Sequence, residues 1–335
     1  MTKDEIIALL EGKDDAGLFE RAAAQRLETF GEEIYLRGIV EFSSYCRCQC
    51  NYCGLRGPNN EIHRYRLSVA EILDAVDELA ALGLPTVVLQ GGEDPHFDVA
   101  TIGRIVQTVK KRHKIAVTLS LGERGAEAFS HWRDCGADRY LLKMETMNPA
   151  LYPNFRPGCD FDQRLASVRS LQVLGYEAGS GIITGLPGMT SDTLADDILA
   201  VTELGLDMIS AGPFVPHQQT PFGGESGGDP QVALRTMAIL RLLNPNANIP
   251  ATSALETVKK EGRKQGIEAG ANVLMFSVTP ETVRKNYAIY PGKNQETNTA
   301  AQTVDNARNL IQGMGLKPSI SLGGSKVGQQ VKQVG

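Results

Sequence analysis

The chain has 335 residues, of which 42% are hydrophobic, and it carries a formal net charge of −5. This length fits either two average domains or one large α/β barrel with a sizeable core. The acidic balance gives no electrostatic reason to expect nucleic acid or an anionic membrane as a partner. The first fifteen residues lack an uninterrupted apolar segment and no run of eighteen apolar residues occurs, so we expect no secretory signal, no membrane span and a cytoplasmic location.

Short β-branched and apolar runs alternate with helical patterns along most of the chain. Residues 3–30 have the pattern of polar helical segments and predict an N-terminal helical cap over residues 1–33. The strands that we expect after this cap span residues 35–42, 86–90, 116–121, 139–146, 177–185, 208–214, 249–254 and 272–277. Helices are expected at residues 68–82, 99–111, 161–174, 190–204 and 230–243, with Ser68 and Ser191 in the N-cap positions.

The number and order of these elements determine the fold prediction. Eight strands that alternate with helices indicate parallel βαβ units, and eight strands close a TIM-type barrel. We therefore predict an α/β fold with one (β/α)8 barrel over residues 34–293 and a helical extension over residues 294–335. An open doubly wound sheet is the alternative that the pattern leaves. No internal repeat, low-complexity tract or Ser/Pro-rich linker indicates a second domain.

Conspicuous polar residues follow the ends of several expected strands. The first cysteine of a cluster, Cys46, stands four residues after the first strand, the segment Gly91-Gly92-Glu93 follows the second, and Glu145 ends the fourth. In a parallel barrel the C-terminal strand ends and the loops after them build the active site. We therefore expect these residues to lie at one face of the barrel.

Four of the six cysteines fall within eight residues, at positions 46, 48, 50 and 53. A disulfide framework would spread its cysteines along the chain, so this clustering indicates metal or redox chemistry. Cys46, Cys50 and Cys53 form the pattern C-x3-C-x2-C, and three thiolates on one loop can hold three irons of a cubane cluster. The fourth iron is then open to a bidentate ligand, and the amino and carboxylate groups of S-adenosylmethionine (SAM) suit it. An electron-carrying [4Fe–4S] ferredoxin uses four cysteines instead.

Three alternatives to this interpretation of the cysteines remain. Structural zinc prefers four closed ligands, often in two separated pairs, whereas these four cysteines are crowded and no second pair is present. A plain electron-transfer cluster would use Cys48 as its fourth ligand, and the cysteines can also be clustered by chance. If the motif started at Cys48, only one residue would separate it from Cys50, and this spacing fits a cluster-binding motif poorly. We therefore take Cys48 as a cysteine that does not bind the cluster.

The sequence resembles the radical SAM superfamily, whose signature is C-x3-C-x-aromatic-C after the first strand of a parallel barrel. From about residue 30 to residue 293, a series of runs resembles the HydE type of [FeFe]-hydrogenase maturase: EFSSYC, NYCGLR, RYRL, LQGGEDP, TLSLGE, ADRYLLKMET, GPFVPH, NIPAT, GANV and YPGK. The same branch contains 3-methylornithine synthase and, more distantly, biotin synthase. The runs YCGLR, TLSLGE and YPGK favour the maturase.

The resemblance implies one [4Fe–4S] cluster, held by the three cysteines of the motif, and a bound SAM. It assigns the contacts with SAM to Tyr52, Gly91, Gly92, Glu93, Glu145 and Arg164. Tyr52 would meet the adenine, and the glycines let the backbone approach the methionine amino group closely. The guanidinium of Arg164 suits the SAM carboxylate, because its fork of donors matches two oxygens.

The resemblance also marks residues around a substrate cavity. Ser120 and Tyr290 are the candidate catalytic residues, and Tyr290 matches a tyrosine that closes the cavity in the family. Arg241, Thr252 and Ser253 stand where related enzymes hold the polar groups of their substrates. These assignments rest on the resemblance alone.

The expected activity is reductive cleavage of SAM to a 5′-deoxyadenosyl radical, in the manner of HydE and in assembly of the hydrogenase H-cluster. Residues 294–335 contain no cysteine, so the accessory C-terminal cluster of some maturases is not expected. Two alternatives remain: a mutase like 3-methylornithine synthase or another small-molecule radical SAM enzyme, and a non-catalytic iron–sulfur carrier. The mutase has an acidic residue where this chain has Ser253-Ala254, which weakens that alternative.

The expected partners follow from this activity. They are a small-molecule or organometallic substrate, a reducing electron donor of the flavodoxin or ferredoxin type, and other maturation proteins. Neither nucleic acid nor a membrane is expected.

Overall fold

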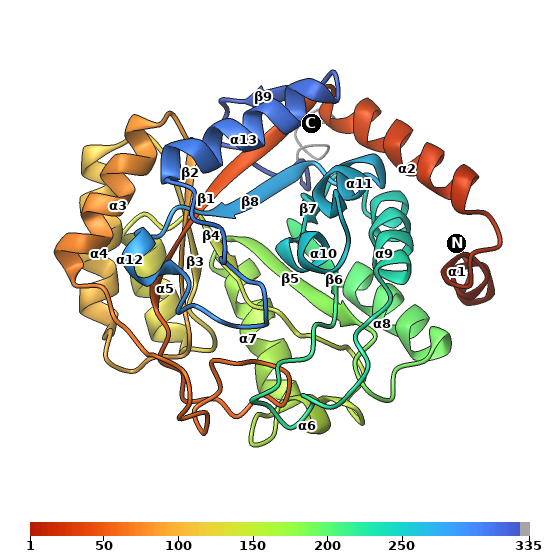
Figure 1. Cartoon of the computed structure of the whole chain (residues 1–335), viewed down its shortest axis with the longest axis horizontal. Helices are drawn as coiled ribbons and strands as arrows, with labels where there is room; N and C mark the ends of the chain where they lie inside the picture. Colours follow the sequence, from red (N-terminus) through yellow and green to blue (C-terminus); the bar gives the residue numbers. More distant parts are fainter. Residues whose placement is uncertain (329–335) are drawn as a thin grey trace.

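A ring of parallel strands surrounded by helices forms the centre of the chain, whose computed structural model describes residues 1–328 (Figure 1). The strands are β1 (Glu33–Ser43), β2 (Thr86–Gly91), β3 (Ala116–Ser120), β4 (Arg139–Leu141), β5 (Glu177–Thr184), β6 (Met208–Pro213), β7 (Pro250–Ala251), β8 (Val273–Ser277) and β9 (Lys317–Ser319). They pair in the order β6-β5-β4-β3-β2-β1-β8-β7, and every pairing is parallel.

The two ends of this sheet also meet. A bridge joins Met208 of β6 to Asn248, and the N–H of Ile209 donates to the carbonyl oxygen of Asn248 at 3.0 Å. Because Asn248 lies two residues before β7, this contact nearly closes the barrel. The predicted (β/α)8 fold is therefore confirmed, and the open doubly wound sheet is excluded.

Thirteen helices are described. They are α1 (Lys3–Leu10), α2 (Asp15–Phe30), α3 (Val69–Ala81), α4 (Val99–Arg112), α5 (Ala126–Asp134), α6 (Tyr152–Phe155), α7 (Phe161–Val173), α8 (Ser191–Glu203), α9 (Pro230–Leu243), α10 (Ser253–Val258), α11 (Gly262–Glu268), α12 (Glu281–Arg284) and α13 (Ala300–Gly313). The capping box expected at Ser68 is present, since its hydroxyl accepts from the Glu71 N–H. Ser191 is not an N-cap, because Thr190 caps α8 by accepting from the Thr193 N–H. Within residues 1–328, no helix is long and apolar enough to cross a bilayer.

The core lies on both sides of the strands. Along β1, every residue from Ile34 to Ser43 is buried, because one face of the strand points into the barrel and the other meets the outer helices. Trp132 of α5 shows the outer layer of this packing, since its ring stacks on Tyr140 of β4 with the centroids 6.3 Å apart. Parallel strands buried on both faces explain why the sequence shows continuous apolar runs.

Two predicted strands are shorter than expected by several residues, and both end at the face where the polar residues gather. The predicted strand 139–146 ends at Leu141, because the chain bends and Glu145 takes a φ of 72°, which leaves only a bridge to Ile182. The predicted strand 249–254 ends at Ala251, and α10 begins at Ser253. At the face where the polar residues gather, local bends of the chain therefore take the place of regular β-strand.

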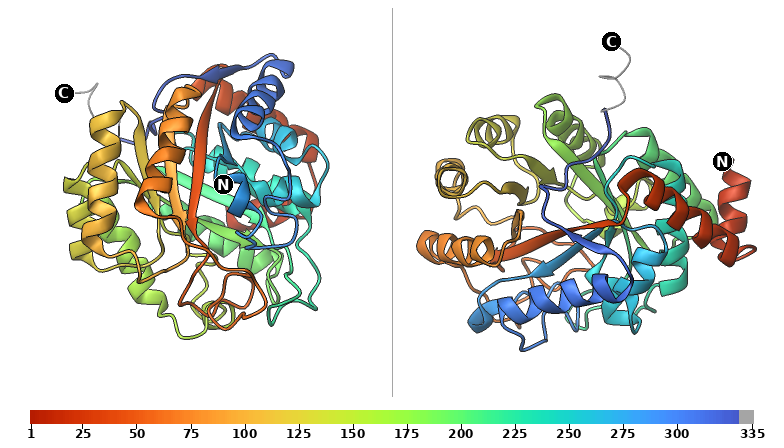
Figure 2. Two further views of the ribbon diagram at one scale, coloured as in Figure 1. Left: turned by 60° about the vertical axis from the view of Figure 1, so that its left-hand side comes forward. Right: turned by 90° about the horizontal axis from the view of Figure 1, so that it is seen from above.

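The sequence predicts a helical extension over residues 294–335. The segment after α13 is not purely helical. It contains β9, which pairs with the start of β1. The chain then runs across the N-terminal end of the barrel (Figure 2), where Arg37 and Arg139 donate to the carbonyl oxygens of Gly323 and Leu322 at 3.1 and 2.8 Å. This crossing covers one mouth of the barrel, so the cavity described below opens at the C-terminal strand ends.

Helices α1 and α2 lie outside the barrel, where α2 packs along α9 and α1 packs beside α8 (Figure 2). We propose the division predicted from the sequence, with a cap at 1–33, a barrel at 34–293 and an extension at 294–335. The last part of that extension, residues 329–335, lies outside the described residues.

Candidate active site

A cavity of about 370 Å³ occupies the C-terminal end of the barrel. Side chains from the loop after β1 and from the ends of β2 to β8 line it. The residues predicted for the site that line this cavity are Cys46, Cys50, Tyr52, Cys53, Gly91, Gly92, Glu93, Ser120, Glu145, Arg164, Thr252, Ser253 and Tyr290. One cavity therefore brings together all but one of the residues that the sequence singled out.

The three motif cysteines lie at one side of this cavity as free thiols. The sulfur of Cys46 accepts backbone N–H groups from Cys48 and Glu93, each at 3.4 Å. The Cys48 thiol donates hydrogen bonds that lower the pKa of Cys46 and of Cys50, although burial opposes this shift. Burial raises the pKa of Cys53. Because thiolates are the metal-binding form of cysteine, this sulfur-rich donor set fits an iron–sulfur cluster.

Two further thiols approach this group. The Cys48 thiol interacts with Cys159, Cys46 and Cys50, and these contacts raise its pKa. Cys159 follows α6 and was not predicted for the site, because no sequence motif connects it with the cluster. Within residues 1–328, no three metal-binding residues are grouped around the position of a single metal ion. The three cysteines of a cubane each bind a different iron, so a cluster does not require them to converge on one point.

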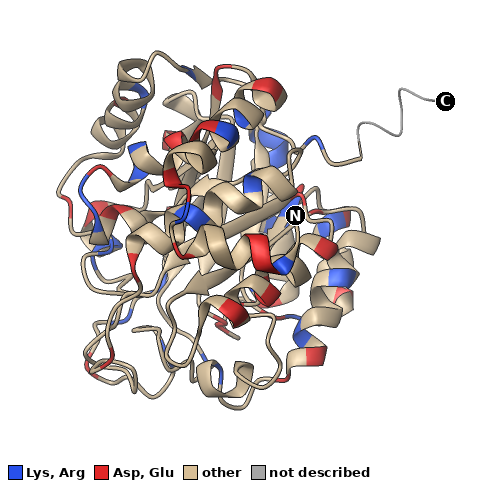
Figure 3. Ribbon diagram, turned by 90° about the vertical axis from the view of Figure 1, so that its right-hand side faces the viewer, with Lys and Arg blue, Asp and Glu red and all other residues tan. Residues whose placement is uncertain are grey.

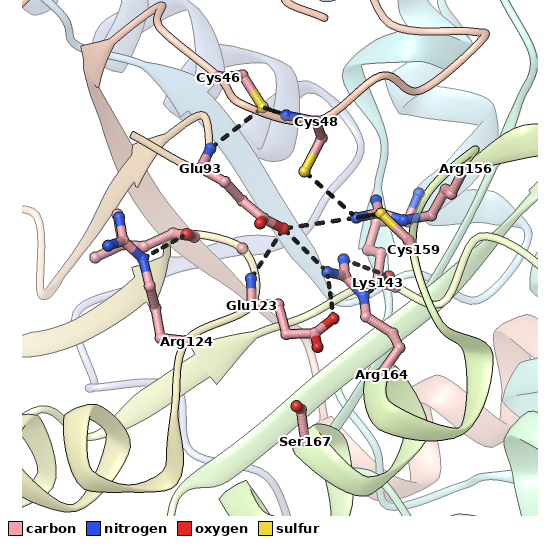
Figure 4. A network of polar contacts seen from close by, with 12 residues as sticks. Cys46, Cys48, Glu93, Glu123, Arg124, Lys143, Arg156, Cys159, Arg164 and Ser167 are labelled. Carbon is pink, nitrogen blue, oxygen red and sulfur yellow. Dashed lines mark hydrogen bonds and ion pairs between the residues drawn. The ribbon is translucent and has the colours of Figure 1, made fainter. Parts of the chain in front are cut away.

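Glu93 is the centre of a buried charge network beside the cysteines (Figure 4). Its Oε1 lies 3.3 Å from Arg164, 3.5 Å from Arg156 and 3.0 Å from the Glu123 N–H that donates to it. Burial alone would raise the pKa of Glu93, but Arg164, the Glu123 N–H and Arg156 together lower it. The Glu93 carboxylate is therefore held charged and in place beside Arg164.

The two glycines before Glu93 allow the backbone to approach the cysteine loop. A Cβ at Gly92 would lie 2.2 Å from the Tyr45 carbonyl oxygen and 2.7 Å from Cys46 Cβ, whereas a Cβ at Gly91 would have no neighbour closer than 3.6 Å. Only glycine fits at Gly92 without displacing the loop. The close approach seen at Gly92 is to the cysteine loop, and approach of this backbone to the SAM amino group stays a prediction.

Glu145 also lines the cavity and has a left-handed backbone conformation, with φ 72°. Tyr52 donates its hydroxyl to Oε1 at 3.1 Å, and the Lys143 ammonium lies 3.0 Å from Oε2. Burial would raise the pKa of Glu145, but Lys143 and Arg156 lower it, so the carboxylate stays charged. Lys143 was missed by the sequence analysis, although its spacing of two from Glu145 on an extended segment could have indicated it.

Asp197 of α8 anchors the backbone that follows Glu145. Its carboxylate accepts the hydroxyl of Thr146 at 2.8 Å and the N–H of Met147 at 2.8 Å, and its side chain is buried. Burial raises the pKa of Asp197 to about 6. A non-glycine residue in the left-handed region costs about 1–3 kcal/mol, so the surrounding contacts must hold Glu145 there.

The predicted substrate residues form another part of the wall. The hydroxyls of Ser253 and Tyr290 lie 2.7 Å apart, and the Lys293 ammonium lies 3.5 Å from Ser253 Oγ and 3.4 Å from the buried carboxylate of Glu41. The Thr252 hydroxyl is buried and has no hydrogen-bond partner among residues 1–328. This part of the cavity wall therefore offers hydrogen-bond donors to a polar ligand.

Ser120 ends β3, and its backbone pairs with Gln90 of the neighbouring strand. It is half-buried and lines the cavity.

Arg241 does not line the cavity. It is fully buried on α9, and its guanidinium donates to the carbonyl oxygens of Gly270 and Ala247 and to Asn272 Oδ1, each at 2.8 Å. Burial lowers its pKa to about 9. The structure thus places Arg241 as a packing residue outside the barrel, which corrects the expectation that it holds the substrate.

Comparison with known proteins matches this geometry to a family. Residues 40–201 match the radical SAM superfamily, and residues 210–317 match the Biotin and Thiamin Synthesis associated domain. Over 322 residues the chain is 41% identical to the [FeFe] hydrogenase maturase subunit HydE of Thermotoga maritima, a match that covers 96% of this chain and 92% of that protein. The chain belongs to the radical SAM superfamily. This radical SAM chain is of the HydE type, and the prediction of a SAM-cleaving enzyme is confirmed.

A second relative of this radical SAM chain is the 3-methylornithine synthase of Methanosarcina barkeri, which is 29% identical over 95% of this chain and 91% of that protein. The crystal structure of methylornithine synthase (PylB) superposes with a TM-score of 0.85 at 28% identity, covering 95% of this chain and 94% of that one. The family uses a [4Fe–4S] cluster and SAM, so the cofactor prediction is confirmed at that level.

Proposed function

We propose that Cys46, Cys50 and Cys53 hold a single [4Fe–4S] cluster and that SAM occupies the adjoining part of the cavity. When bound, the cluster supplies the electron that cleaves the SAM sulfonium to a 5′-deoxyadenosyl radical. The observation that carries this proposal is the position of the three free thiols at one side of the cavity at the C-terminal end of the nearly closed strand ring. A primary carbon radical must be kept from solvent, and this barrel provides the shielding.

The charged residues around the thiols suit the two ends of an amino acid. Glu93 and Glu145 are buried carboxylates whose surroundings lower their pKa, so each is available to an ammonium group. Arg164 donates from Nε and Nη2 to the Lys143 carbonyl oxygen at 3.1 and 2.8 Å, and its Nη1 lies 3.3 Å from Glu93 and 3.6 Å from Glu123. These contacts fix a guanidinium at the cavity wall, and its positive charge suits a carboxylate. We propose that these side chains, with Tyr52 at the adenine and the backbone of Gly91 and Gly92 at the methionine amino group, orient SAM.

We propose that other residues lining the cavity hold the substrate. Thr252 has an unpaired buried hydroxyl, Ser253 and Tyr290 share a hydrogen bond, and Ser120 faces the same cavity. Similarity to HydE supports a small organometallic iron–cysteine precursor of the hydrogenase H-cluster as substrate. We further propose a cytoplasmic location, a flavodoxin-type or ferredoxin-type electron donor and contact with other maturation proteins.

A second candidate is a carbon-skeleton rearrangement like that of 3-methylornithine synthase, which the TM-score of 0.85 to PylB favours. Ser253-Ala254 stands where an acidic residue would meet a substrate ammonium, and this difference favours the HydE-type substrate.

Anaerobic reconstitution followed by dithionite and SAM tests the proposal. About four irons per chain and release of 5′-deoxyadenosine are expected. A non-catalytic iron–sulfur carrier would bind iron and release no 5′-deoxyadenosine. Incubation with lysine separates the two enzyme candidates, because only the mutase would yield an isomerised amino acid.

A further inference from the structure

Two thiols beside the cluster site, Cys48 and Cys159, have no role in the proposed cluster. Cys48 belongs to the cysteine loop and lines the cavity, whereas Cys159 lies between α6 and α7. The Cys48 thiol donates a hydrogen bond to the Cys159 sulfur, so the two sulfurs are in contact. Cys48 is buried and Cys159 is half-buried. The contact therefore joins a thiol of the cavity wall to a thiol nearer the surface.

Arg156 brings a positive charge to both thiols (Figure 4). Its Nη2 lies 4.0 Å from the Cys48 sulfur and 3.7 Å from the Cys159 sulfur. Along the outer helices near the N-terminus, basic and acidic residues are mixed (Figure 3), whereas Arg156 is buried and has its ion-pair partner, Glu93, at 3.5 Å. Water screens a buried charge only weakly, so Arg156 stabilises a thiolate in this pair.

Cys159 is the thiol of the pair that is prepared to react. The hydrogen bond from Cys48 and the charge of Arg156 lower the pKa of Cys159 to about 6, although burial opposes this shift. A thiolate, and not a thiol, attacks the sulfur of a disulfide. Cys159 is also the more accessible of the two, so a small disulfide meets it first.

We propose that Cys48 and Cys159 are a redox-active thiol pair that forms a disulfide by exchange with a low-molecular-weight disulfide, such as oxidised glutathione. The Cys159 sulfur attacks oxidised glutathione, which gives a mixed disulfide and releases one glutathione thiolate. The Cys48 sulfur then attacks the Cys159 sulfur, gives up its proton and releases the second glutathione. Two electrons pass from the pair to oxidised glutathione. No metal takes part, so the pair does not depend on the proposed function.

The pair also protects the thiols of the cysteine motif. The Cys48 thiol contacts Cys46 and Cys50 in addition to Cys159. In a chain without Cys159, oxidation of Cys48 would therefore join it to a cysteine of the motif. Such a disulfide prevents cluster binding, because a metal binds the thiolate form. A disulfide between Cys48 and Cys159 leaves all three motif thiols free.

Disulfide mapping of the full-length chain before reconstitution tests the pair. The protein is incubated with oxidised glutathione without oxygen, the remaining thiols are blocked with a maleimide, and the peptides are identified by mass spectrometry. The wild type should lose two of its six thiols and yield one peptide pair joined through Cys48 and Cys159. Cys135→Ser, at a buried cysteine that ends α5, is the matched control and should yield the same peptide pair. Cys159→Ser should lack it, and its Cys48 should instead pair with Cys46 or Cys50.

The outcomes that contradict the pair are distinct. A wild type in which Cys48 stays free, or whose disulfides are those of Cys159→Ser, would overturn the thiol pair. A free Cys48 in oxidised Cys159→Ser would overturn the protection of the motif thiols.

The same oxidation of the reconstituted enzyme separates the pair from the proposed function. The Cys48–Cys159 disulfide should form while the iron content stays at about four per chain, because neither thiol is an assigned ligand. Iron loss in proportion to this disulfide would support the pair and overturn the ligand assignment of the proposed function. Absence of the disulfide with full iron content would overturn the pair alone.

Discussion

Gly92 and Gly91 form a matched pair for testing whether the position of the cysteine loop is required for cluster binding. A Cβ at Gly92 would lie 2.2 Å from the Tyr45 carbonyl oxygen, whereas ordinary C···O contacts begin at about 3.3 Å. The loop must therefore retreat by about 1 Å in Gly92→Ala, and such overpacking costs about 1–3 kcal/mol. A Cβ at Gly91 has its nearest neighbour at 3.6 Å, so Gly91→Ala requires no such movement.

The assay is the iron content after anaerobic reconstitution, measured together with the melting temperature. Gly91→Ala should retain about four irons per chain, while Gly92→Ala should retain fewer than about two, because Cys46 moves with the loop. Both variants should remain folded. Full iron loading of Gly92→Ala, or equal loss in both variants, would refute the claim that this contact positions the cluster ligands.

Three further predictions concern other parts of the structure. Cys50→Ala should abolish 5′-deoxyadenosine release, while Cys48→Ala should leave it largely intact, and loss of activity in Cys48→Ala alone would overturn the assigned ligand register. Asp197→Ala should raise the KM for SAM about tenfold, since releasing Glu145 loses a charged hydrogen bond of about 1.5–3 kcal/mol. Asp197→Asn should largely restore the wild-type KM. Equal KM values in both variants would count against this anchoring. Arg241→Met should lower the free energy of unfolding by several kcal/mol, because buried acceptors lose their donor at about 1–3 kcal/mol each, and the KM for the substrate should not change; a raised substrate KM at unchanged stability would restore a role at the site.

The pH dependence of stability gives a further prediction for Asp197. Burial raises its pKa to about 6, above the ordinary value of 3.8, so the folded chain takes up this proton at a higher pH than the unfolded chain does. Ionised Asp197 therefore costs about 3 kcal/mol above about pH 6, and the cost disappears as the pH falls toward 4. As the pH falls from about 7 to about 4.5, the thermal stability of the wild type relative to Asp197→Asn should rise. A constant difference would show that the carboxylate carries no such penalty.

The barrel was predictable because its strands are buried on both faces. Continuous apolar runs such as β2 and β3 stand out from the helices between them, and their predicted bounds agree with the structure to within one residue. The ends of β4 and β7 were not predictable in this way. Their residues have strand-like composition, but the chain bends there to face the cavity, and tertiary contacts such as those of Asp197 hold the bend.

The site was predictable where local spacing encodes the chemistry. Three thiols within one loop can be recognised from the sequence, because the spacing alone brings them close enough together to hold one cluster. Arg156 and Cys159 could not be found in this way, since they reach the thiols from a distant loop and no short motif includes them. Arg241 shows the opposite error, because a resemblance assigns a position without showing whether its side chain faces the cavity or the packing around it.

The central claim is that three protein thiolates leave one iron of the cluster open for SAM. Electron–nuclear double resonance on the reduced, reconstituted enzyme tests it most directly, using SAM labelled with ¹⁵N in its methionine amino group. The account predicts a hyperfine coupling between the cluster and this nitrogen in the wild type and in Cys48→Ala. A reduced cluster without such coupling in both proteins, or zinc in place of iron, would contradict it.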